Sequence, residues 1–171
     1  MNKRITLGIL LFVLVLAADQ LTKLWILYGI DLPNLGRIEL LPILELTYVR
    51  NRGITFGLLN GGIIGPLVLG AFALIIVAGL FWWLRKAESN LVAAALGAIA
   101  GGAVGNVIDR VRYGAVIDFL HLHAWNWDPF RYVFNVGDSA IVCGVTALLI
   151  DGLIEGMHPS HKGQTSGREA P

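Results

Sequence analysis

Four long apolar stretches run along the sequence and predict four membrane-spanning helices. The clearest covers residues 63–84, which carry no charged side chain and would form about 33 Å of helix against about 30 Å of hydrocarbon in a bilayer. The other predicted spans cover residues 5–28, 91–108 and 134–153. Together these spans indicate an integral membrane protein.

The first predicted span begins like a different kind of segment. Residues 5–18 are apolar and follow Lys3 and Arg4, as in a secretory signal peptide. The apolar character resumes after Asp19 and Lys23, however, so the stretch exceeds the roughly 7–15 apolar residues of a signal peptide. We therefore interpret it as a spanning helix.

Glycines recur every four residues in the third predicted span, at Gly97, Gly101 and Gly105. Positions four apart lie on one stripe of a helix, and small residues there let a neighbouring helix approach closely. We expect this stripe to pack against another span.

Two stretches between the spans alternate in hydrophobicity, which is typical of strands with one buried face. In residues 43–59, Leu44, Leu46 and Tyr48 alternate with their neighbours before a turn signal at residues 51–53. Residues 114–123 alternate in the same way. We expect these segments to form a small antiparallel sheet on the outer membrane surface.

The predicted fold class is therefore an all-α membrane protein with four transmembrane helices and a small extracytoplasmic antiparallel β-sheet, in one integral membrane domain over residues 1–171. Four spans place both termini on the same side. The second span ends in two tryptophans followed by Arg85 and Lys86, which indicates its cytoplasmic end. The remaining basic residues do not decide the orientation. The polar residues 156–171 are predicted to be a disordered cytoplasmic tail.

Composition supports the membrane assignment and excludes several functions. Hydrophobic residues make up 56% of the chain and charged residues 15%, with a mean hydropathy of +0.69, whereas soluble domains have about 25% charged residues. The net charge of +1 gives no basic field for nucleic-acid binding. The single cysteine, Cys143, excludes a disulfide framework and a multi-thiolate zinc site.

Charged and amide side chains gather at the predicted outer ends of the spans. A charge at the centre of a spanning helix costs about 2.5–3.5 kcal/mol on insertion scales, so such residues are functional candidates. The residues concerned are Asp19, Lys23, Asn106, Asp109, Arg110, Asp118, Asn135 and Asp138. Folding would bring them together as an active site or as an ion-pair network.

Spacing separates two of these acids from the others. Asp19 lies four residues before Lys23, and Asn106 four before Arg110, which favours structural pairs on a helix face. Asp118 and Asp138 have no cation three or four residues away. Asp118 and Asp138 are therefore candidates for a catalytic pair, although Asp138 could instead be a helix N-cap.

Five motifs, taken in order, resemble those of the lipoprotein signal peptidases, the signal peptidase II family. They are DQLTK at residues 19–23, NRGITF at 51–56, NVIDR at 106–110, GAVIDF at 114–119 and FNVGDS at 134–139. Two departures exist: Ile54 and Thr55 replace the usual alanines, and Gly137 replaces an alanine before the second aspartate. Neither departure removes a functional group.

The resemblance implies an intramembrane aspartic endopeptidase that cuts prolipoproteins just before a diacylglyceryl-modified cysteine, with Asp118 and Asp138 catalytic. Such a pair shares one proton and activates water without a metal or other cofactor. The implied substrate-binding or supporting residues are Asp19, Lys23, Asn51, Gly53, Asn106, Asp109, Arg110, Asn135 and Ser139. Diacylglyceryl-modified prolipoproteins, membrane lipid and globomycin-type inhibitors are the implied partners. The implied location is the bacterial inner membrane, with the active site on its extracytoplasmic face.

Other chemistries remain to be weighed. His121 and His123 share a strand face and could bind zinc, but Asp118 points to the opposite face and no third ligand is evident. Cys143 is expected to be a buried thiol and Ser139 a hydrogen-bonding group, since neither has a suitable base. Outer acids would also suit a proton-coupled carrier, although the chain shows no inverted repeat.

An aromatic cluster completes the candidate features of the outer surface. Its members are Trp125, Trp127, Phe130 and Tyr132. Aromatic residues commonly anchor a segment at the headgroup level of the bilayer. This cluster could do so and also cover the site.

Overall fold

The computed structural model describes residues 2–53, 64–123 and 132–157. Its four long helices all have the length and apolarity needed to cross a membrane, as predicted. They are α1 (Lys3–Leu24), α3 (Ile64–Leu84), α4 (Asn90–Tyr113) and α5 (Val136–Met157). A π-helical turn, η1 (Trp25–Gly29), extends α1, and the short helix α2 (Leu32–Leu35) follows it.

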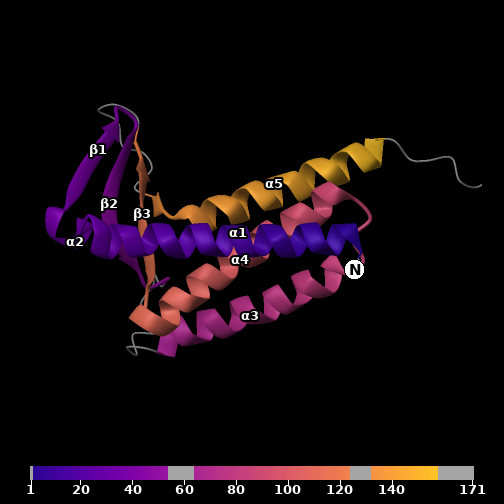
Figure 1. Ribbon diagram of the computed structural model, residues 1–171, viewed down its shortest axis with the longest axis horizontal. Coiled ribbons are helices and arrows are strands. Elements are labelled where there is room, and N and C mark those ends of the chain that lie inside the picture. Colours follow the sequence, from indigo (N-terminus) through magenta and orange to yellow (C-terminus); the bar gives the residue numbers. More distant parts are fainter. Residues whose placement is uncertain (1, 54–63, 124–131, 158–171) are drawn as a thin grey trace, which may run out of the picture.

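Helix α4 is the centre of the bundle and packs against α1, α3 and α5 (Figure 1). Its glycines permit this because a side chain would collide with the neighbouring backbone. A Cβ on Gly97 would lie 2.0 Å from the carbonyl oxygen of Gly8 in α1, and one on Gly102 would lie 2.3 Å from that of Gly137 in α5. The predicted glycine stripe is confirmed, since Gly101 also faces α1.

A four-stranded antiparallel sheet stands across one end of the helix bundle (Figure 1). Its order is β1 (Arg37–Leu41), β2 (Leu44–Asn51), β3 (Val116–Leu122) and β4 (Val133–Phe134). The two predicted strands correspond to β2 and β3. A small core joins the sheet to η1 and α2, with Ile26, Leu32, Leu46 and Phe119 all buried.

Three boundaries differ from the predictions. The third predicted span ends at residue 108, but α4 continues to Tyr113 because Asp109 finds polar partners inside the protein. Phe134 was assigned to the fourth span but belongs to β4, where it pairs with Leu120. Helix α5 continues to Met157, so the predicted tail begins later than residue 156.

The start of α1 and the end of α5 lie at the end of the bundle opposite the sheet (Figure 1). This arrangement agrees with the prediction that both ends of the four-span bundle face the same side. Several predicted features lie outside the described residues: the motif positions Ile54 and Thr55, the aromatic residues at 125, 127 and 130, and residues 158–171 of the tail.

Candidate active site

The eight polar residues predicted to gather do lie together where the helices meet the sheet. They come from α1, α4, β3, α5 and the residue that precedes α5. Asp19, Lys23, Asn106, Asp109, Asp118 and Asn135 are buried, whereas Arg110 and Asp138 are half-buried. Such burial demands partners, because an unpaired buried charge is strongly unfavourable.

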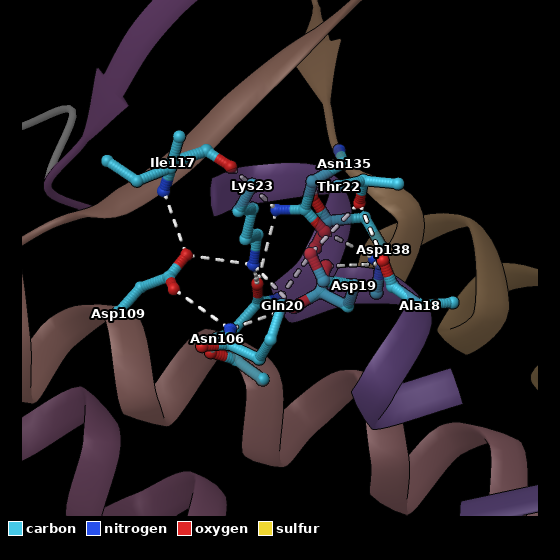
Figure 2. Close-up of polar contacts among 12 residues, drawn as sticks. Ala18, Asp19, Gln20, Thr22, Lys23, Asn106, Asp109, Ile117, Asn135 and Asp138 are labelled. Carbon is cyan, nitrogen blue, oxygen red and sulfur yellow. Dashed lines mark hydrogen bonds and ion pairs between the residues drawn. The ribbon is translucent and has the colours of Figure 1, made fainter. Parts of the chain in front are cut away.

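Lys23 is the central cation of this group. Its Nζ lies 2.7 Å from Asp19 Oδ2, 2.8 Å from Asp109 Oδ2 and 3.0 Å from Asn106 Oδ1 (Figure 2). The ion pair with Asp19 is the one that the spacing predicted. The pair with Asp109 joins α1 to α4, so Lys23 fixes two helices relative to one another.

Both carboxylates bound to Lys23 also hold backbone amides. Asp109 Oδ2 accepts a hydrogen bond of 3.0 Å from the N–H of Ile117, and Asp19 Oδ1 accepts one of 2.8 Å from the N–H of Gly137. Ile117 and Gly137 are the residues directly before Asp118 and Asp138. The backbone leading into each candidate catalytic aspartate is therefore anchored to the same ammonium group. We call Asp19, Lys23 and Asp109 the anchoring triad.

Three asparagine amides donate to the two candidate aspartates. Asn135 Nδ2 lies 2.7 Å from Asp118 Oδ1, and Asn51 Nδ2 lies 2.9 Å from Asp118 Oδ2. Asn106 Nδ2 lies 2.8 Å from Asp138 Oδ1. The oxygen of Asn106 already accepts from Lys23, so its NH₂ group must point to Asp138. These amides hold both carboxyl groups in fixed orientations.

Asp138 also takes part in a reciprocal cap at the start of α5. Asn135 Oδ1 accepts from the N–H of Asp138 at 2.8 Å, while Asp138 Oδ2 accepts from the N–H of Asn135 at 3.2 Å. The N-cap is therefore Asn135, and the alternative in which Asp138 is the N-cap is wrong by three positions. Ser139 Oγ donates to the Asn135 carbonyl at 3.0 Å, which reinforces this turn.

Arg110 has unused hydrogen-bonding capacity beside the two acids. Its Nη1 donates to the backbone oxygen of Asn106 at 3.2 Å, so the predicted pairing of these residues is made through the main chain. Its Nε is buried and has no hydrogen-bond partner among the described residues. Gly53, with φ of 75°, donates from its N–H to Asn51 Oδ1 at 2.8 Å and so helps to fix the Asn51 amide.

The two candidate aspartates interact electrostatically. Burial, together with the charge of Asp138, raises the pKa of Asp118 to about 6, against the hydrogen bonds from Asn51 and Asn135 and the charge of Lys23, which lower it. Like charges held close cannot both ionise easily, so the pair retains a proton up to about pH 6, well above the ordinary range of a carboxyl group. One protonated and one ionised carboxyl group are what acid–base hydrolysis requires.

The histidines lie in a separate cluster on the other side of β3. His121 Nδ1 is 2.7 Å from Glu45 Oε1, and Arg37 Nη1 is 3.4 Å from Glu45 Oε2. Burial raises the pKa of Glu45, but the hydrogen bonds from His121 and Thr47 and the charge of Arg37 outweigh it, so the pKa is lowered. Within residues 2–53, 64–123 and 132–157, no group of three or more histidine, cysteine, aspartate or glutamate side chains could hold a metal ion.

Two further residues change the sequence-based interpretation. Cys143 was expected to be buried but is exposed on the surface of α5, because its helix face is turned away from α4. Gln20 was not singled out, yet its Nε2 donates to Asp109 Oδ1 at 3.1 Å and to the Gly105 carbonyl at 3.2 Å. Its position inside the first motif was the available signal.

A surface cavity of about 410 Å³ adjoins the candidate site along α5. Its lining residues are Phe134, Asp138, Ser139, Val142 and Cys143. One of the two candidate aspartates therefore faces both the polar network and an apolar groove.

This arrangement of paired acids at the end of a four-helix membrane bundle agrees with a family comparison. A family model described as signal peptidase (SPase) II matches residues 11–154. The chain belongs to the signal peptidase II family. As a signal peptidase II, it is an aspartic endopeptidase and a multi-pass membrane protein, and it removes signal peptides from prolipoproteins. This assignment replaces the proton-coupled carrier as the explanation of the outer acids.

Individual relatives agree with the family. The lipoprotein signal peptidase of Methylorubrum extorquens (strain PA1) is 48% identical over 150 residues, which are 85% of this chain and 85% of that protein. That of Rhodopseudomonas palustris (strain ATCC BAA-98 / CGA009) is 43% identical over 157 residues, covering 88% and 93%. A bacterial membrane enzyme solved by the in meso method at 2.3 Å resolution has a TM-score of 0.73 and 29% identity, covering 94% of each chain.

Proposed function

We propose that Asp118 and Asp138 are the catalytic dyad of this signal peptidase II, and that it cuts directly before a diacylglyceryl-modified cysteine. The observation that carries the proposal is the shared anchoring of the two acids. The residue before each one is tied to the anchoring triad, and each carboxyl group accepts from asparagine amides. No other pair of acids among the described residues is held in this way.

We assign the proton of the dyad to Asp118, because its carboxyl group is buried whereas that of Asp138 is only half-buried. Protonated Asp118 donates its proton to the oxygen of the scissile carbonyl, and ionised Asp138 takes a proton from a water molecule. The water oxygen bonds to the carbonyl carbon and forms a neutral tetrahedral diol. The C–N bond then breaks as Asp138 returns its proton to the leaving nitrogen and Asp118 recovers one from the diol. No metal or cofactor is required.

The surrounding residues have positioning and binding roles in this proposal. The carboxyl groups are oriented by three asparagines, Asn51, Asn106 and Asn135. Gly53 supports Asn51, and Ser139 supports Asn135. Arg110, whose buried Nε has no hydrogen-bond partner among the described residues, is assigned to the binding of the substrate backbone. The anchoring triad acts through the backbone at Ile117 and Gly137 and through the Asn106 amide, and does not touch the substrate.

The proposed orientation places the sheet and the dyad on the extracytoplasmic side of the bacterial inner membrane, with both termini cytoplasmic. In support, Lys86 Nζ lies 3.9 Å from the ring centroid of Trp82, beside Trp83 and Arg85. Aromatic and basic residues together are typical of a cytoplasmic interface. They lie at the end of α3 that connects to α4, and the end of α4 that meets the sheet is the opposite one.

The proposed partners are diacylglyceryl-modified prolipoproteins, membrane lipid and globomycin-type inhibitors. A dyad at the ends of spanning helices lies at the glycerol and headgroup level of the bilayer. Acyl chains would hold a peptide bond at that level, since each buried CH₂ contributes about 0.8 kcal/mol to membrane association. We therefore expect lipidation of the substrate to strengthen recognition.

The test is cleavage of a lipidated precursor peptide by the parent protein, Asp118→Asn and Asp138→Asn. Both variants should lose turnover while keeping their helix content, and Glu39→Gln on the exposed strand β1 should keep activity. Cleavage by either dyad variant would contradict the assignment. EDTA or phenanthroline should leave turnover unchanged; inhibition that zinc reverses would revive a metal site at His121 and His123.

The same assay tests the role of the lipid. The diacylglyceryl-modified precursor should be cleaved with at least about tenfold higher kcat/KM than the unlipidated peptide, about 1.4 kcal/mol at the transition state. Equal values for the two precursors would reject the proposed substrate recognition.

A further inference from the structure

A second cavity lies at the end of the bundle opposite the sheet, and the proposed mechanism uses none of its residues. The end of α3, the start of α4 and the end of α5 come together there (Figure 1). The cavity between them has a volume of about 370 Å³. We call it the distal cavity. Its walls combine apolar and charged side chains, among them Trp83, Lys86, Glu88, Val92, Asp151 and Glu155.

The distal cavity carries an excess of negative charge. Three carboxylates line it, those of Glu88, Asp151 and Glu155, against the single ammonium group of Lys86. The Nζ of Lys86 is already placed over the ring of Trp82, 3.9 Å from its centroid. Within the described residues, none of the three carboxylates has an ion-pair or hydrogen-bond partner. The cavity can therefore bind a cationic group that the described part of the chain does not supply.

These acids run against the usual composition of the membrane face that we propose for them. Cytoplasmic ends of spanning helices are normally enriched in lysine and arginine, yet the last turn of α5 contains Glu155 and no basic residue. The carbonyl end of a helix already has a partial negative charge, so a carboxylate there is unfavourable by itself. A cation from another molecule would compensate both the helix end and the carboxylate.

An open stripe of α4 connects the distal cavity to the proposed dyad. Helix α3 packs against Val107 of α4, and α5 packs against Gly102 on a different side of the same helix. Between these two contact faces lie Val92, Ala103 and Arg110, whose spacings of 11 and 7 residues are close to whole numbers of helical turns. All three are only half-buried. Val92 lines the distal cavity, and Arg110 lies beside the dyad.

The distance between the two ends of this stripe matches the build of a signal peptide. In a signal peptide, a basic n-region precedes an apolar h-region of about 7–15 residues, which as a helix is about 10–22 Å long. Asp151 lies 13 positions beyond Asp138 on α5, a rise of about 20 Å. A signal peptide whose cleavage site lies at the dyad therefore has its n-region at the level of the distal cavity.

We propose that the distal cavity binds the basic n-region of the substrate's signal peptide, while the apolar h-region lies along the open stripe of α4. The inference rests on the proposed function and its orientation, and it adds a second recognition site at the opposite face of the membrane. Charge complementarity supports this occupant, because the n-region supplies the cations that the three carboxylates lack. The protein thus recognises its substrate at both ends of the h-region.

The test compares two diacylglyceryl-modified precursors that differ only in the n-region, which contains two lysines in one and two glutamines in the other. The measured quantity is the lysine-to-glutamine ratio of their kcat/KM values, in an uncharged detergent at low salt. The parent protein should give a ratio of about five, as expected for two partly exposed ion pairs. The combined variant Glu88→Gln, Asp151→Asn and Glu155→Gln should give a ratio of about one.

Glu39→Gln is the matched control, since Glu39 is an exposed acid on β1 at the other end of the molecule. Its ratio should equal that of the parent. A ratio is used because partial unfolding lowers both kcat/KM values equally and cancels. High salt should bring the parent ratio towards one, because screening weakens exposed ion pairs; a salt-independent ratio would contradict recognition by charge.

Single variants keep the test decisive if the combined variant does not fold. Glu155→Lys should lower the ratio further than Glu155→Gln, because it reverses the charge instead of removing it. A parent ratio of about one would overturn the inference, as would an unchanged ratio in the cavity variants or an equal change in Glu39→Gln. If the parent protein cleaves neither precursor, the proposed function is rejected instead.

Discussion

Replacing Asp118 by asparagine should stabilise the folded protein as the pH rises, although it removes activity. Asp118 is 1% exposed, and its burial beside Asp138 disfavours the ionised form. In the parent protein, ionising this carboxyl group therefore lowers the free energy of unfolding. Asparagine is nearly isosteric and cannot ionise, so the variant avoids this loss.

The size of the effect follows from the pKa of Asp118. The difference between the ordinary value of 3.8 and the raised value of about 6 corresponds to about 3 kcal/mol, at about 1.4 kcal/mol per pH unit. Below about pH 4 the carboxyl is protonated in the folded and unfolded protein, and ionisation has no effect. Between about pH 4 and pH 6 only the unfolded chain releases the proton, so parent stability falls as pH rises.

The quantity to measure is the difference in unfolding free energy between Asp118→Asn and the parent from pH 2 to pH 8. Unfolding by SDS in mixed micelles, followed by circular dichroism, provides it. Only the change of this difference with pH is interpreted. Its pH-independent part also contains a destabilisation of about 1–3 kcal/mol, because the new amide NH₂ faces the donating NH₂ group of Asn51 or Asn135. The difference should rise by about 3 kcal/mol across this range and level off above about pH 6.

Glu45→Gln is the matched control, because its expected sign is opposite. The pKa of Glu45 is lowered, so its ionised form stabilises the folded protein above the ordinary pKa, and this stabilisation disappears as the pH falls. The glutamine variant should therefore become less stable relative to the parent as the pH rises to the ordinary glutamate value of 4.5, and the difference should be constant above it. A pH-independent difference for Asp118→Asn, or the same sign for both variants, would refute the electrostatic account of the dyad.

Two further predictions concern packing and the anchoring triad. Gly102→Ala should destabilise the bundle by about 1–3 kcal/mol, since its Cβ would lie 2.3 Å from the Gly137 carbonyl oxygen. Gly79→Ala, whose Cβ would have nothing within 4 Å, should be neutral or stabilising. Equal thermal midpoints for the two variants would contradict this packing. Lys23→Met should lower unfolding free energy by about 3–5 kcal/mol, because two buried carboxylates lose their cation, and adding Asp109→Asn should restore part of it; no loss in the single variant would show that the triad is not coupled.

Hydropathy was sufficient for the helices but not for their polar ends. The third span was predicted to stop at residue 108 because Asp109 and Arg110 follow it. In the structure Asp109 is 1% exposed and bound to Lys23, so the helix continues. A residue from another helix supplies this compensation, and no local window of sequence contains it.

The sheet shows a similar limit. Strands β2 and β3 were predictable because apolar residues alternate along their sequences, although four consecutive residues of β3 are buried. Strand β1 was not, since four of its five residues are exposed and its pairing with β2 defines it. Strand β4 has only two residues, too few for any periodic pattern to appear.

The candidate site was predictable from motifs more than from spacing. The five ordered motifs contain Asp118, Asp138 and the three asparagines that contact them. Spacing alone left Asp138 open as an N-cap, and the reciprocal cap with Asn135 shows why the two roles were hard to separate. The backbone contacts of Asp19 and Asp109 could not be inferred from sequence. The contact of Asp19 with Gly137 spans 118 positions, and that of Asp109 with Ile117 spans eight positions and crosses from a helix to a strand.

The main-chain N–H groups of Ile117 and Gly137 connect both members of the dyad to one side chain, Lys23 of α1. Each connection consists of a backbone amide and a carboxylate, Asp109 for Ile117 and Asp19 for Gly137, and both carboxylates bind the same ammonium group. The two anchored positions are also closely packed, since Ile117 is 1% exposed and a Cβ on Gly137 would lie 3.0 Å from Asp19 Oδ1. The placement of both acids therefore depends on one side chain of a membrane helix, in addition to the strand and the helix that carry the acids.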